Sequence, residues 1–149
     1  AAGNQPFDLQ NALTPAEVYP QLATWTENAR TLYYAFTLID YAFPFFAGLF
    51  IAATAAFALR TSLPGWYAAL TDRKLLPVFM LGTAFDWLEN LAALGVISLY
   101  PAEIGWLPLV LVIAKKLKLV CVMSAQAAML LVLLYAAGNW LAARLRLRR

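Results

Sequence analysis

Residues 106–140 read WLPLVLVIAKKLKLVCVMSAQAAMLLVLLYAAGNW, an apolar run with three lysines in its first half. Apart from Pro108 near the start and Gly138 near the end, the run contains no turn-forming residue, and AKKLKL at 114–119 consists of good helix formers. The run predicts one helix of about 35 residues, roughly 50 Å long at 1.5 Å per residue. The alternative is two helices broken at the lysines.

The composition indicates an integral membrane protein. Of the 149 residues, 63% are hydrophobic and only 13% charged, and the mean hydropathy is +0.68; a soluble domain carries about 25% charged residues. We expect an all-α helical bundle in a single membrane domain, because three segments are long enough to cross about 30 Å of hydrocarbon. The net charge of +3 comes from basic residues that flank these segments, which argues against nucleic-acid binding. The predicted spans are residues 31–59, 75–99 and 105–141.

The N-terminal part predicts an amphipathic helix ahead of the first span. Residues 1–13 are polar and are expected to be irregular. Thr14, Pro15 and Glu17 match a helix start, with a capping threonine, proline at the first helical position and a glutamate three residues after the cap. We expect a helix over residues 14–30 that lies on the membrane surface or caps the bundle, and that continues directly into the first span.

The distribution of charge favours three spans over four. Basic residues gather in the connection at 60–74 and in the tail at 142–149, whereas acids gather in the N-terminal segment and in the turn at 100–105. Three spans place both basic regions in the cytoplasm, as the positive-inside rule requires, whereas a fourth would send the tail across. We expect a multi-pass protein of a bacterial inner membrane, with the N-terminus outside and the C-terminus cytoplasmic. The basic side chains expected to contact anionic lipid headgroups are Arg144, Arg146, Arg148 and Arg149.

Six ionisable side chains inside the three predicted spans, three acids and three lysines, reach a common depth, roughly 14–20 Å from the outer ends of the helices at 1.5 Å per residue. An unpaired charge at the centre of a bilayer costs about 3 kcal/mol, so we expect the acids and lysines to pair. Asp86 and Glu89 share one helix face and would bind Lys118 and Lys115, while Lys116 is rotated about 100° away. The predicted polar cluster is Asp40, Asp86, Glu89, Asn90, Lys115 and Lys118.

The residues that the chain lacks narrow its chemistry. It contains no histidine and one cysteine, Cys121. The chain therefore offers neither the usual axial ligand of haem and chlorophyll nor the commonest protein ligand of zinc. A single cysteine also excludes an intrachain disulfide. We expect no cofactor and no metal, and any proton chemistry would run on carboxylates, lysine, tyrosine or water.

Several short motifs resemble those of a family of small, uncharacterised bacterial polytopic membrane proteins. The motifs are FDLQNALTPAEVY at 7–19, Asp40 with Pro44, FDWLEN at 85–90, YP at 100–101 and LKL at 117–119. The resemblance implies no activity. It implies a site formed by Asp40, Asp86, Glu89, Asn90 and one lysine, which matches Lys118, whereas Lys115 and Lys116 are additions to the family pattern.

Two functions from different classes follow from these observations. The first, which the charge balance favours, is a non-enzymatic subunit or assembly component of a membrane complex, surrounded by lipid and joined to further copies or other subunits. The second is an enzyme or carrier that acts on a lipophilic, isoprenoid-like substrate. In that case Asp86 or Glu89 would be the catalytic acid or base, and Lys118 would tune its charge.

Overall fold

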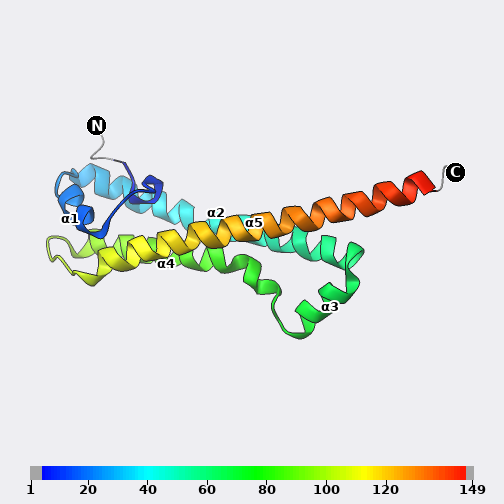
Figure 1. Ribbon diagram of the computed structural model, residues 1–149. Coiled ribbons are helices and arrows are strands. Elements are labelled where there is room, and N and C mark those ends of the chain that lie inside the picture. The colour runs from blue at the N-terminus through cyan, green and yellow to red at the C-terminus, as the bar shows by residue number, and fades with distance from the viewer. Residues whose placement is uncertain (1–4, 147–149) are drawn as a thin grey trace.

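The computed structural model describes residues 5–146, and the described chain is an elongated bundle of helices. Helices α2 (Glu27–Ser62), α4 (Leu81–Leu99) and α5 (Trp106–Arg146) run side by side. The short helices α1 (Pro15–Ala23) and α3 (Pro64–Asp72) lie toward opposite ends of this bundle (Figure 1). Two 3₁₀ turns, η2 (Phe7–Leu9) and η3 (Leu76–Met80), complete the order of elements. No strand occurs within residues 5–146.

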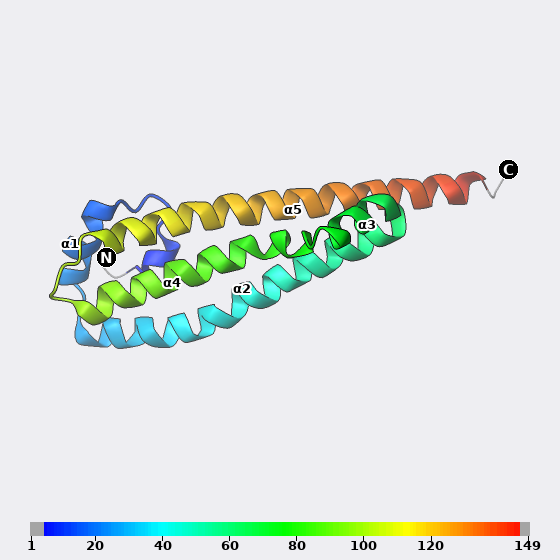
Figure 2. The same ribbon diagram turned by 90° about the horizontal axis from the view of Figure 1, so that it is seen from below.

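Helix α5 is continuous through its lysines, so the prediction of one long helix is confirmed and the alternative of a break at residues 114–119 is wrong. The helix contains 41 residues and continues past the expected end at residue 141, as far as Arg146. At 1.5 Å per residue it is about 60 Å long. Its C-terminal end extends past the other helices (Figure 2). Of the four tail arginines, Arg148 and Arg149 lie outside the described residues.

Two of the helices, α2 and α5, are long and apolar enough to cross a membrane. The second predicted span, residues 75–99, is divided in the structure, because η3 occupies Leu76–Met80 and α4 begins at Leu81. Helix α4 contains 19 residues, about 28 Å of helix, and carries two acids. The count of three spans therefore stays a prediction.

The expected continuous helix from residue 14 into the first span is wrong. Helix α1 begins at Pro15 as predicted but ends at Ala23, and α2 begins at Glu27. The Thr26 side chain caps α2 by accepting a hydrogen bond from the backbone N–H of Ala29 at 3.2 Å. Between the two helices, Trp25 turns inward and stacks on Phe7 with ring centroids 4.8 Å apart. The burial of this indole explains the break.

The N-terminal segment belongs to the core of the bundle. Phe7, which was expected in an irregular polar stretch, is completely buried and contacts the rings of Trp25 and Tyr33. Leu13 and the buried face of α1 pack in the same cluster with apolar residues of α4 and α5. The segment before α1 therefore folds back into the bundle and brings its own side chains toward α5.

Helices α2 and α4 approach each other closely near Pro44 of α2. Pro44 removes one helical N–H donor and disturbs the backbone ladder of α2. Two side chains of α4 donate to carbonyls of this region: the Thr83 hydroxyl to Pro44 at 2.7 Å and the Trp87 indole to Tyr41 at 2.9 Å. Gly48 is buried against Thr83, and a Cβ there would collide with the threonine hydroxyl.

Candidate functional site

The ammonium group of Lys118, on α5, is the centre of the polar cluster. Its Nζ lies 2.6 Å from Asp8 Oδ1, 2.5 Å from Asp86 Oδ1 and 2.7 Å from Glu89 Oε2. Asp8 belongs to η2, whereas Asp86 and Glu89 lie three residues apart on one face of α4. Lys118 thus connects α5 to one carboxylate of η2 and two of α4. Each of these charge-assisted contacts is short.

Lys115, one turn earlier on α5, binds the N-terminal segment. Its side chain is 2% exposed, and its Nζ lies 3.4 Å from Glu89 Oε1. The same ammonium donates hydrogen bonds to the backbone carbonyls of Phe7 and, at 3.0 Å, Gln10. Each carbonyl also accepts a backbone hydrogen bond, Phe7 from the N–H of Gln10 and Gln10 from the N–H of Leu13, so the lysine adds a second donor to each. Lys115 thus ties the N-terminal segment to α5 and also compensates the charge of Glu89.

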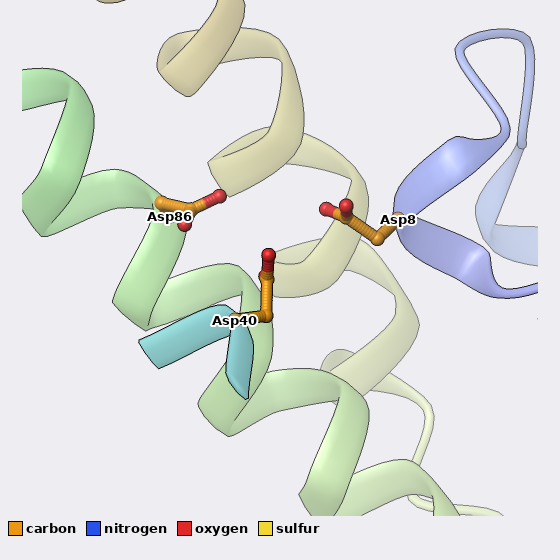
Figure 3. A group of neighbouring side chains, drawn as sticks. All are labelled: Asp8, Asp40 and Asp86. Atoms are coloured by element: carbon orange, nitrogen blue, oxygen red, sulfur yellow. The ribbon is translucent and has the colours of Figure 1, made fainter. Parts of the chain in front are cut away.

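Asp40 approaches the cluster from α2. One of its carboxylate oxygens accepts a hydrogen bond from the Asn90 amide at 2.9 Å. Carboxylate oxygens of Asp8, Asp40 and Asp86 all lie within 4.8 Å of one another. Figure 3 shows these three side chains pointing toward a common centre from η2, α2 and α4. Asp40 therefore contributes a negative charge beside two other carboxylates.

All six residues predicted for the cluster come together, although their pairing differs in part. Glu89 contacts both lysines and Asp86 contacts Lys118, as expected. Asp40 binds Asn90, a contact that the sequence analysis did not name. Lys116 is exposed on α5, in agreement with its rotation away from the other two lysines. Within residues 5–146, the polar cluster consists of Asp8, Asp40, Asp86, Glu89, Asn90, Lys115 and Lys118.

Asp8 is the member of the cluster that the sequence analysis missed. It was assigned to the acidic outer segment, because residues 1–13 showed neither helical periodicity nor an apolar run. The available signal was its neighbour Phe7, a large aromatic in an otherwise polar stretch, together with the FDL motif of the resemblance. With Asp8 included and Lys116 turned away, the cluster contains four carboxylates and two ammonium groups, so the expected balance of three against three is wrong.

A groove of about 300 Å³ opens beside the cluster, between α2, α4 and α5. Its polar end is formed by Asp8, Asp40, Asp86 and Lys118. The rest of its wall is mainly apolar, and it includes Phe43, Ala47, Ile51, Phe79, Leu119 and Val122. The groove thus combines a charged end with a hydrophobic channel, which is the chemistry that an amphiphilic molecule requires.

The three neighbouring aspartates are also the residues that would hold a hard metal ion, which prefers oxygen ligands. Lys118 Nζ already lies between Asp8 Oδ1 and Asp86 Oδ1. A metal bound by both of these oxygens would have to displace the ammonium. The geometry therefore favours an ammonium over a metal in this position, and the absence of a cofactor stays a prediction.

The geometry of the cluster is the basis for any statement about function. No family model, curated protein or solved structure matches this chain. The resemblance in sequence motifs therefore stays a prediction, and the contacts of the cluster and the groove carry the proposals below.

Proposed function

We propose that this chain is a non-enzymatic component of a membrane assembly, most simply an oligomer of the chain itself. The observation that carries the proposal is the exposed apolar surface of the C-terminal half of α5, a helix whose end extends past the other helices of the bundle (Figures 1 and 2). Its large apolar side chains are open: Leu131 is 67% exposed and Leu134 is 60% exposed. Such a surface needs a cover of lipid or protein.

The length of α5 argues that lipid covers only part of it. At a typical tilt of about 20°, a helix of about 60 Å rises about 56 Å along the membrane normal. A bilayer is about 30 Å thick in its hydrocarbon core and about 45 Å thick with its headgroups. Apolar residues occur along almost the whole helix, so a segment of it would emerge into water. Contact with a second copy would cover this segment.

The polar cluster fits such a component, because both of its lysines are paired with carboxylates of the same chain. Lys118 binds Asp86 of α4 and Asp8 of the N-terminal segment. Lys115 donates a hydrogen bond to the backbone carbonyl of Gln10 in the same segment. Buried ion pairs of this kind fix which helices meet and in which register. We assign the cluster a positioning role: it holds the N-terminal segment, α2 and α4 on α5.

The oligomer is tested by sedimentation of the full chain in a mild detergent. We expect a protein mass that is a multiple of 16.4 kDa. Leu131→Asn should reduce the oligomer, because it places an amide on the exposed half of α5. The matched variant Leu38→Asn changes an equally exposed leucine on α2 and should leave the oligomer intact. A stable monomer of the unaltered chain would overturn the proposal.

We further propose that the C-terminus is cytoplasmic and that the exposed Arg144 and Arg146 contact anionic headgroups. The support is that α3 and the C-terminal end of α5 lie toward the same end of the bundle, away from α1 (Figure 1). In a Cys121→Ser background, Thr71→Cys should resist an impermeant maleimide added from outside, whereas Glu103→Cys should react. The reverse labelling would overturn the orientation.

A second function is favoured by the groove, namely that the chain binds a lipophilic molecule as a carrier. Binding is better supported than acid–base catalysis, because Asp86 and Glu89 both hold Lys118 and neither is a free base. Lipids that co-purify with the unaltered chain should be lost from Ala47→Phe, which fills the groove. They should also be lost from an Asp86→Asn, Glu89→Gln double variant whose helical circular dichroism is unchanged. Identical lipid content in all three proteins would overturn this second function.

A further inference from the structure

We propose that the groove between α2, α4 and α5 binds an amphiphile with an ammonium head and a single alkyl tail. The inference rests on the second function above, that the groove holds a lipophilic molecule, and it adds the chemical class of the head group. It follows from the charges at the polar end of the groove, from the way in which Lys118 is bound there, and from the apolar wall.

The polar end of the groove has an excess of negative charge. Four carboxylates, those of Asp8, Asp40, Asp86 and Glu89, face two ammonium groups, which leaves a formal charge of −2. Among residues 5–146, Asp40 forms no ion pair, and its contact is the neutral amide of Asn90. A cationic head would reduce the repulsion between these carboxylates, whereas a phosphate or carboxylate head would increase it. Charge complementarity therefore selects a cation.

The cluster already binds an alkylammonium group, because the side chain of Lys118 is one. Its Nζ is held by three carboxylates at distances of 2.5–2.7 Å. A second ammonium would find Asp40 and the remaining oxygen of Asp86. Asp86 is 4% exposed, and within the described chain its Oδ2 has no hydrogen-bond partner. A nine-tenths-buried carboxylate that lines a groove with one oxygen unused is a site for a donor.

The remaining wall of the groove selects the tail. Apart from Thr83 and Gln126, its side chains are apolar, from Phe43 and Ala47 on α2 to Leu119 and Val122 on α5. A volume of about 300 Å³ holds about ten groups the size of a water molecule at roughly 30 Å³ each. This is the room needed by an alkyl chain of about eight carbons with its head. Two-chain phospholipids are too large, and they carry a phosphate next to any amine.

The test uses n-octylammonium as the probe, with n-octanol and octanoate as comparison ligands of equal chain length. The full chain is placed in nanodiscs of zwitterionic lipid, and binding is measured by titration calorimetry with empty nanodiscs subtracted. We expect one octylammonium per chain, bound about tenfold more tightly than octanol. Octanoate should show no binding.

Two variants, each with a matched control, test separately whether the site recognises the ammonium head and whether the ligand occupies the groove. Asp40→Asn removes one charge but keeps the side-chain size and an acceptor for Asn90, so it should weaken octylammonium binding about tenfold and leave octanol unchanged. Its control is Glu103→Gln, an exposed acid in the α4–α5 connection. Ala47→Phe should abolish binding of both ligands, and its control is Ala42→Phe, an exposed alanine of the same helix.

The outcomes distinguish a wrong head group from a groove that binds no ligand at all. If octanol and octylammonium bind equally and Asp40→Asn changes neither, the ammonium head is wrong while the groove remains a binding site. If neither ligand binds, or if Ala47→Phe has no more effect than Ala42→Phe, the groove is not a binding site and both proposals fail.

Discussion

Lys115 on α5 donates a hydrogen bond to the backbone carbonyl of Phe7, a residue 108 positions earlier in the chain. This contact, together with the bond to Gln10, fixes an irregular segment inside a helical bundle. Lys115 thus ties the N-terminal segment to α5, in addition to its ion pair with Glu89. The buried lysine therefore has a structural role that its charge alone would not suggest.

Replacing Lys115 by methionine should destabilise the chain by about 3–5 kcal/mol, because the change removes one partner of a buried ion pair. It also removes the hydrogen bonds from the lysine to the carbonyls of Phe7 and Gln10, which hold the N-terminal segment on α5. The measurement is the free energy of unfolding in mixed micelles. Lys116→Met is the control, because Lys116 is exposed and its loss should change stability by less than about 0.5 kcal/mol. Equal effects of the two substitutions would contradict the assignment.

Phe7→Ala should detach the N-terminal segment, at a cost of about 3–5 kcal/mol for a fully buried aromatic ring. The rings of Trp25 and Tyr33 lose their stacking and edge contacts with Phe7. Hydrogen exchange of backbone amides in residues 5–13 measures the detachment. Leu9→Ala, at a side chain that is 57% exposed in the same 3₁₀ turn, should leave the exchange unchanged. Equal protection in Phe7→Ala and the unaltered chain would show that the ring does not anchor the segment.

The start of α1 should show a pH dependence that comes from Glu17. The Glu17 carboxylate accepts hydrogen bonds from the hydroxyl and the backbone N–H of Thr14, both at 2.8 Å, and these bonds lower the pKa of Glu17 from its ordinary value of 4.5. Because the folded pKa is depressed, the contribution to helix stability is present above pH 4.5 and is lost as the pH falls below it.

Thr14→Ala should therefore raise the pKa of Glu17 toward its ordinary value, as measured by NMR of the labelled carboxyl carbon. Thr31→Ala removes a threonine of α2 whose hydroxyl bonds to the backbone of its own helix, and it should not change the titration. An unchanged Glu17 titration in Thr14→Ala would mean that the capping contact is absent in solution.

Much of the helical framework could be predicted from the sequence, because it depends on local chemistry. The uninterrupted run of helix formers around Lys115 gives one helix, and Thr14 with Pro15 marks the start of another. Spacing along α4 places Asp86, Glu89 and Asn90 on one face, and in the structure the two acids contact the lysines while Asn90 binds Asp40. These features could be predicted because the spacing of residues along a helix determines which side chains share a face.

The parts that could not be predicted depend on contacts between distant residues. The position of Asp8 follows from the burial of Phe7, and Phe7 is held by Lys115 and Trp25 from other elements. No local periodicity records such a contact. The same stacking of Trp25 interrupts the helix that its apolar spacing predicted, so tertiary packing overrides the local pattern there. The groove likewise arises only when α2, α4 and α5 are placed together.

The close approach of α2 and α4 makes a last prediction, on two glycines. Gly48 is buried against Thr83, so Gly48→Ala should force the helices apart and destabilise the chain by about 1–3 kcal/mol. A Cβ on Gly138 would meet nothing within 4 Å, so Gly138→Ala should stabilise α5 by up to about 1 kcal/mol through helix propensity. Thermal unfolding of the two variants in the same detergent gives shifts of opposite sign. If Gly48→Ala is as stable as Gly138→Ala, then α2 and α4 do not pack at Thr83, and the groove beside this contact has a different shape.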